Sequence, residues 1–208
     1  MEEMKREGVP PDRDCYICLL CVLRTEQSTE ALEICWNEMI QSGILPDTRC
    51  HNEMLCSYAV MGDISKCQEI FQALCRTAYL PDQCTFLALF TSISTFLHKS
   101  HALHHPLTHS TRVYAERRSR QMGGMSYEEI RALVEDWEEE MKQRFKIRLS
   151  GALLTVLLQL YGRLWSVVDV ERVMQWAERE GLKPDLHAYN TAISAVAAGQ
   201  KVHRCHPS

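Results

Sequence analysis

A short motif recurs at a fixed spacing along the chain, and this spacing restricts the possible folds more than any other feature. Gly-x-x-Pro-Asp occurs three times, ending at Asp12, Asp47 and Asp185, and a variant with Ala78 in place of glycine ends at Asp82. The first two intervals between the aspartates are 35 residues, and the third is 103, two short of three such periods. Self-similarity at a fixed period of about 20 to 50 residues is typical of stacked repeats.

Each copy of the motif predicts a corner between two helices. Glycine ends a helix in the left-handed conformation, proline cannot continue that helix, and aspartate caps the next one. Between corners, apolar residues recur at helical spacing over 15–23 and 29–40, and again over 52–60 and 64–74. Each repeat is therefore predicted to be a helical hairpin, and hairpins must stack because one alone buries too little apolar surface.

The corners divide the chain into repeats of unequal regularity. Residues 83–150 are predicted to hold two degenerate repeats with a loop near 98–125, and a single insertion is the alternative. Within them we expect a helix over 84–97, and another opened by a capping box of Ser126 and Glu129. The remaining segments are the end of a truncated repeat at 1–12, two repeats at 13–82, one repeat at 151–185 and a partial repeat at 186–208. Both ends of the sequence fall within a repeat. We therefore expect that the sequence is part of a longer protein, that it comes from an incomplete gene model, or that neighbouring molecules shield its ends.

Composition excludes several classes of protein. The formal charge is −4, from 23 basic and 27 acidic residues, which is not typical of indiscriminate nucleic-acid binding. No apolar run approaches the roughly 20 residues that cross a bilayer, and the first residues resemble neither a signal peptide nor an acid-poor transit peptide. The 10 cysteines are expected to be buried, small apolar residues in a reducing compartment.

These motifs resemble the pentatricopeptide repeat family. The resemblance is carried by the corners at this period, by Trp36-Asn37-Glu38-Met39 and by Ala188-Tyr189-Asn190-Thr191-Ala192-Ile193. Tetratricopeptide repeats have a unit of about 34 residues and a Trp-x-x-Leu-Gly-x-x-Tyr signature, and neither occurs in this chain. The resemblance implies an all-α, right-handed superhelical solenoid of antiparallel helix pairs that binds RNA in an organelle.

In that family the fifth and last residues of a repeat face one base edge. Carried over, this gives the pairs Ile17/Asp47, Asn52/Asp82 and Thr155/Asp185, and Asn190 without its partner. Asn52 with Asp82 resembles the combination that prefers uracil, and Thr155 with Asp185 the one that prefers guanine. Ile17 offers no hydrogen bond. A purely structural alternative is that the aspartates only cap helices and that Asn52 and Asn190 are only solvated residues near helix starts.

Cationic side chains complete the expected RNA site. Arg24 and Arg163, near the ends of first helices, are candidates for phosphate contacts, whereas repeat 48–82 has Val60 there. Arg49 is the second residue of its repeat, and its guanidinium plane could stack on a base. In the other repeats the second residue is Asp14, Ala152 or His187, whereas the family usually has an aliphatic residue at this position. The basic run 117–120 is either an RNA-gripping loop or a solvated segment.

The expected function is binding rather than catalysis. The resemblance implies single-stranded or ribosomal RNA as partner, a mitochondrial location, and a role in RNA maturation, translation, or a mitochondrial ribosome or its assembly intermediate. The alternative is a protein-interaction scaffold in an organellar ribonucleoprotein, favoured by the negative charge and the acidic segment 128–140. No catalytic motif, cofactor, small-molecule substrate or membrane is expected. Cys15, Cys18 and Cys21 have the Cys-x-x-Cys-x-x-Cys spacing found in the iron–sulfur cluster loops of ferredoxins. The fourth cysteine of such a loop, which is followed by proline, is absent, and the three cysteines lie in a predicted helix.

Overall fold

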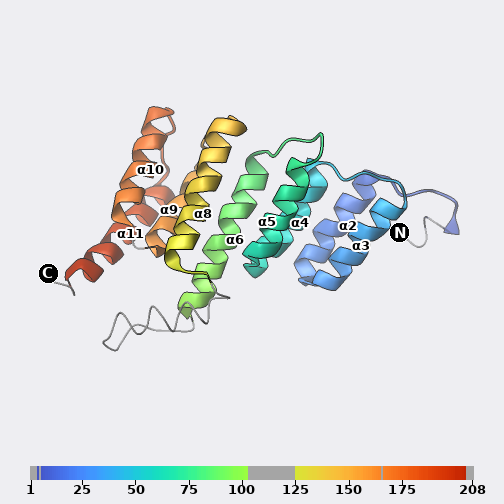
Figure 1. Ribbon diagram of the computed structural model, residues 1–208, viewed down its shortest axis with the longest axis horizontal. Helices are drawn as coiled ribbons and strands as arrows, with labels where there is room; N and C mark the ends of the chain where they lie inside the picture. Colours follow the sequence, from blue (N-terminus) through green and yellow to red (C-terminus); the bar gives the residue numbers. More distant parts are fainter. Residues whose placement is uncertain (1–3, 5, 103–124, 165, 205–208) are drawn as a thin grey trace. The chain divides into compact units, whose positions relative to one another are not determined.

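The computed structural model describes residue 4 and residues 6–102, 125–164 and 166–204. Within these ranges all regular secondary structure is helical, which confirms the all-α class. The chain forms two compact units, Met1–Ser92 (unit 1) and Ile93–Ser208 (unit 2). Each unit is built from neighbouring helix pairs (Figure 1).

Unit 1 contains the two most regular repeats. Helix α2 (Arg13–Glu26) pairs with α3 (Thr29–Gln41), and α4 (Thr48–Met61) pairs with α5 (Ile64–Cys75). The first helices of the two hairpins, α2 and α4, also pack against each other. On the second helices, Trp36 is half-buried, and Ile34 and Ile40 are exposed. The apolar residues buried there are Leu32, Cys35, Met39, Ile64, Cys67, Ile70, Phe71 and Leu74. The start of α6 (Gln83–Ala102) completes the unit.

Unit 2 repeats this arrangement with α9 as the central helix. Helix α9 (Gly151–Arg163) contacts both α10 (Val167–Arg179) and α11 (Leu186–Arg204). Before it, α8 (Tyr127–Glu139) continues into a π-helical turn, η1 (Glu140–Arg144). The predicted capping box of α8 is confirmed, with reciprocal backbone-to-side-chain bonds of 2.6 and 3.1 Å between Ser126 and Glu129.

The corners have the geometry that their residues predict. Gly43 and Gly181 have φ of 80° and 70°, a left-handed conformation that favours glycine. The residue after each glycine donates its amide back to a carbonyl five positions earlier, as in a Schellman motif. The four corner aspartates each accept the amide three residues later, at 2.8 to 3.0 Å; they are Asp12, Asp47, Asp82 and Asp185. Their capping role is therefore confirmed.

A further corner forms without the motif, after the π-helical turn η1. Lys146, 35 residues before Gly181, has φ 54°, and Ser150 accepts the amide of Leu153 at the start of α9. This corner closes the irregular segment 83–150. Helix α6 extends beyond the expected 84–97 to Ala102, and the rest of the expected loop at 103–124 lies outside the described residues. The number of repeats in this segment stays a prediction.

The cysteines in the described ranges differ in burial. Cys35, Cys50 and Cys67 are buried as expected, whereas Cys18 and Cys84 are exposed. The others are of intermediate burial: Cys15, Cys21, Cys56 and Cys75. All the cysteines in the described ranges are free thiols. In those ranges no three His, Cys, Asp or Glu residues are arranged to hold a metal ion, and no helix is long and apolar enough to cross a membrane.

Candidate nucleic-acid interface

Asn52 and Asp82, the candidate uracil-reading pair, are brought together by the corner between α5 and α6. Asn52 Nδ2 donates to Asp82 Oδ1 at 3.0 Å, and Thr85 Oγ1 lies 2.7 Å from Asn52 Oδ1 and 3.1 Å from Asp82 Oδ1. Asn52 is 8% exposed, whereas Asp82 is exposed. The bonds that the Asp82 carboxylate accepts from Asn52 and Thr85 all use its Oδ1, so its Oδ2 can accept a hydrogen bond from a ligand.

Thr85 is a member of this cluster that sequence reasoning missed. Its amide donates to Asp82 Oδ1 at 3.0 Å, and the Asp82 amide donates to Thr85 Oγ1 at 3.1 Å, so the two residues form a reciprocal cap at the start of α6. The Asp-x-x-Thr spacing is the signal that could have identified it. The cap holds the Asp82 carboxylate in the orientation in which it meets Asn52.

Thr155 and Asp185, the candidate guanine-reading pair, are each bonded elsewhere. Thr155 Oγ1 donates to the carbonyl of Gly151 at 3.0 Å, within its own helix. Asp185 accepts the amide of Ala188 at 2.8 Å and is exposed. Asn190 is exposed on α11. A base that bonds Thr155 would have to redirect its hydroxyl. A base that bonds Asn52 Oδ1 would likewise compete with Thr85, but Asn52 and Asp82 already lie within hydrogen-bond distance of each other.

Two of the three candidate cations form ion pairs with carboxylates of unit 1. Arg49 lies 2.9 Å from Asp14, the residue at the same position of the preceding repeat, and both are exposed. Arg24 lies 3.7 Å from Glu53. These carboxylates offset the positive charge that a phosphate would meet.

The third candidate cation, Arg163, is directed into unit 2. It donates to the backbone carbonyl of Ser94 at 3.1 Å and to the Ser94 hydroxyl. Burial lowers the pKa of Arg163. A phosphate contact at this residue would therefore compete with an internal bond.

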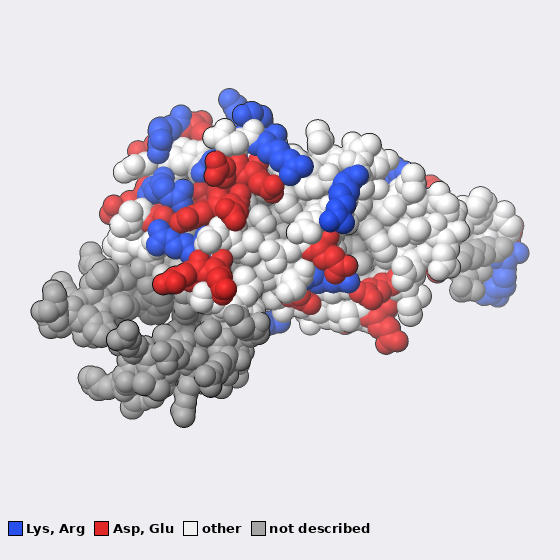
Figure 2. Space-filling model, in the orientation of Figure 1, with Lys and Arg blue, Asp and Glu red and all other residues white. Residues whose placement is uncertain are grey.

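The visible surface agrees with this pairing of charges. On the face seen in Figure 2, lysine and arginine lie in separate groups, several of them beside aspartate and glutamate, rather than in one basic stripe along the described surface. The basic segment 117–120, the other proposed source of positive charge, lies outside the described residues.

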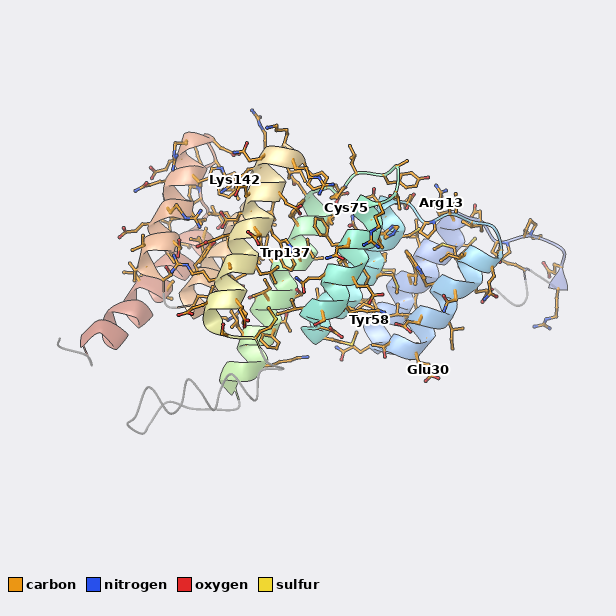
Figure 3. All side chains as sticks on the ribbon, in the orientation of Figure 1. Arg13, Glu30, Tyr58, Cys75, Trp137 and Lys142 are labelled. Atoms are coloured by element: carbon orange, nitrogen blue, oxygen red, sulfur yellow. The ribbon has the colours of Figure 1, made fainter. Side chains whose placement is uncertain are left out.

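A buried charge network in unit 2 was not foreseen. Glu138 of α8 is 2% exposed and accepts from Arg172, Lys142 and Tyr161, at 2.9, 2.8 and 2.7 Å respectively. Burial raises the pKa of Glu138, but the bonds from Arg172 and Lys142 outweigh it and hold the pKa below its ordinary value. Lys142, labelled in Figure 3, also lies 3.6 Å from the ring centroid of Trp176.

This network changes the interpretation of the acidic segment 128–140. Glu138 faces the interior, while Glu135 and Glu140 pair with Arg131 and Arg144 one turn away on their own helical segment. Three of the segment's seven acidic residues therefore form ion pairs within unit 2. Sequence periodicity could not reveal this, because Arg172 lies 34 residues from Glu138.

Comparison with known proteins gave matches among solved structures alone. No protein-family model matches the sequence, and no curated protein matches it. Similar structures include the pentatricopeptide repeat protein PPR10 in complex with an 18-nt psaJ RNA element, at 18% identity and TM-score 0.43, and PPR10 from maize, at 19% and 0.42. These alignments cover 98% of this chain but 36% and 35% of those chains, so this chain spans about a third of their length. The 35-residue hairpins and capped corners, rather than this distant likeness, show that the chain is a helical-repeat protein.

Proposed function

We propose that this chain is an RNA-binding helical-repeat protein of mitochondria that reads single-stranded RNA without catalysing a reaction. The observation that carries the proposal is the Asn52–Asp82 pair: a first-helix side chain bonded at 3.0 Å to the last residue of its repeat, Asp82, which is exposed. Amide and carboxylate groups at this position match the donors and acceptors of a base edge. The biological role that fits is RNA maturation or translation, or a place in the mitochondrial ribosome or its assembly intermediate, on ribosomal RNA.

An exchange of base preference tests this proposal. In Asn52→Thr, the repeat acquires the Thr/Asp combination expected to prefer guanine. We expect its affinity for short RNAs to shift from uracil towards guanine at one position by about fivefold or more, because a good base-edge contact is worth about 1 to 3 kcal/mol. Fluorescence anisotropy with matched RNAs that differ at a single base would measure the change.

A control separates base reading from loss of structure. Thr85→Ser keeps the hydroxyl that caps α6 and touches Asn52, so we expect it to keep the uracil preference. Uniformly weaker binding of Asn52→Thr to every RNA, with no change of preference, would mean that Asn52 is structural. Equal preference for all bases in the unmodified protein would reject base reading by this repeat.

A protein-interaction scaffold within a ribonucleoprotein is the second candidate. It is favoured by the internal partners of the three candidate cations, since paired charges reduce the electrostatic attraction of RNA. Crosslinking in cells, followed by denaturing purification, separates the two candidates. Retained messenger RNA would support a processing or translation role, retained ribosomal RNA a ribosomal one, and protein crosslinks without RNA the scaffold.

A further inference from the structure

Unit 1 contains a pocket of about 280 Å³ between α3, α4 and α5. Its polar and aromatic lining residues are Glu33, Trp36, Asn37, His51, Lys66 and Glu69. None of them is a candidate base-reading or phosphate-contacting residue. The pocket is therefore a second site whose occupancy can be tested separately from RNA binding.

His51 provides a hydrogen-bond acceptor in this pocket. Its ring is 3% exposed, and Nδ1 lies 2.8 Å from the backbone carbonyl of Asp47, so Nδ1 carries the proton and donates. Nε2 is then an acceptor, and nothing in the described part of the chain donates to it. Trp36 meets the His51 ring edge to face, with 5.1 Å between centroids. Burial lowers the pKa of His51 and keeps the ring neutral.

The rest of the pocket is negatively charged. Lys66 lies 3.2 Å from Glu33 and 3.3 Å from Glu69, so two carboxylates and one ammonium leave a net charge of −1 around a neutral imidazole. Tyr58, labelled in Figure 3, donates to Glu33 at 3.0 Å and holds that carboxylate in place. Phosphate-bearing ligands would meet the wrong sign of charge, whereas a cation with several hydrogen-bond donors would find acceptors and an aromatic ring.

We propose that this pocket receives an arginine side chain of a protein partner. The guanidinium would lie against Trp36, donate to Nε2 of His51 and donate to Glu33 or Glu69. Arginine fits better than lysine because its planar group stacks on aromatic rings and carries five donors in a fixed fork, so it can satisfy a nitrogen and a carboxylate acceptor together. This contact attaches the helical repeats to a partner protein, whether or not unit 1 also binds RNA.

Titration of the full chain with a blocked arginine tests the proposal. N-acetyl-arginine methylamide is the probe, and the citrulline analogue, which has the same shape without the charge, is its control. We expect saturable NMR shifts of the Trp36 indole and His51 ring, with apparent affinity for arginine at least fivefold above that for citrulline. Equal affinity for both, or no saturable shift at either ring, would overturn the proposal.

Variants locate the probe in the pocket. Glu33→Gln with Glu69→Gln should weaken arginine binding at least fivefold, whereas Glu30→Gln, an exposed charge on α3 outside the pocket (Figure 3), should not. If the double variant fails to fold, Glu69→Gln alone serves, because its side chain is 70% exposed. The double variant should change RNA affinity no more than Glu30→Gln does. Displacement of the blocked arginine by single-stranded RNA would reject a protein partner here.

Discussion

Arg172 of α10 donates to both carboxylate oxygens of Glu138 on α8, at 2.9 and 3.4 Å. The same guanidinium donates to Tyr161 of α9 at 2.9 Å and to Asp169 at 3.3 Å. Three helices of unit 2 are therefore joined around one buried carboxylate, which would be costly to leave unpaired.

Arg172→Met is expected to destabilise unit 2 by about 3 kcal/mol, because it removes the main partner of a buried charge. Urea denaturation followed by circular dichroism measures the loss. Adding Glu138→Gln should recover part of it, since no buried charge then remains. A double variant that is less stable than Arg172→Met alone would contradict this account.

Acid should weaken the same network. The pKa of Glu138 is held below its ordinary value of 4.5, so its ionised form stabilises the folded state at pH values above about 4.5. This contribution is lost as the pH falls through the lowered pKa. The melting temperature of the native protein should therefore fall more steeply below pH 4.5 than that of Glu138→Gln, and parallel curves would refute the prediction.

Gly162→Ala is expected to reduce stability although alanine favours helices. A Cβ at Gly162 of α9 would lie 2.7 Å from Cβ and 3.3 Å from Cα of Ala195 on α11, so the helices must separate. The expected loss is about 1 to 3 kcal/mol, as for other overpacked cores. Gly151→Ala, where a Cβ meets nothing within 4 Å, is the matched control and should be neutral or slightly stabilising. Equal unfolding midpoints in denaturant would argue against close packing of α9 and α11.

Asp14→Asn should strengthen RNA binding by unit 1. The change releases Arg49 from an exposed ion pair of 2.9 Å and removes a negative charge next to it. We expect an affinity gain of about two- to fivefold and a steeper dependence on salt. Glu30→Gln removes the same charge elsewhere on unit 1, and an equal gain in that variant would show a net-charge effect rather than the release of Arg49.

The thiols should differ in reactivity. Burial raises the pKa of Cys35 and Cys50 to about 11 and that of Cys67 to about 12, so these residues remain protonated at neutral pH. Exposed Cys18 and Cys84 should react first with iodoacetamide at pH 8, as measured by mass spectrometry of peptides. Urea should make all five react, and early labelling of Cys67 in the native protein would contradict the packing of α5.

Much of the fold could be predicted because its signals are local. A left-handed glycine, a proline and a capping aspartate act within a few residues, so the corners at Gly43 and Gly181 were predicted correctly. The corner at Lys146 and Ser150 was missed because it has neither the glycine nor the aspartate of the motif: Lys146 takes the left-handed conformation and Ser150 caps the next helix.

The sequence by itself determined the period, the helix pairs and the capped corners, and the family resemblance added candidate positions for reading a base. Only the tertiary structure decided which charges those positions meet. Asp14 with Arg49, Arg163 with Ser94, and the open acceptor of His51 depend on contacts between residues that different helices bring together. Helical periodicity predicts which face of a helix is buried. It does not predict the partner of a polar side chain, because that partner depends on how the next helix packs.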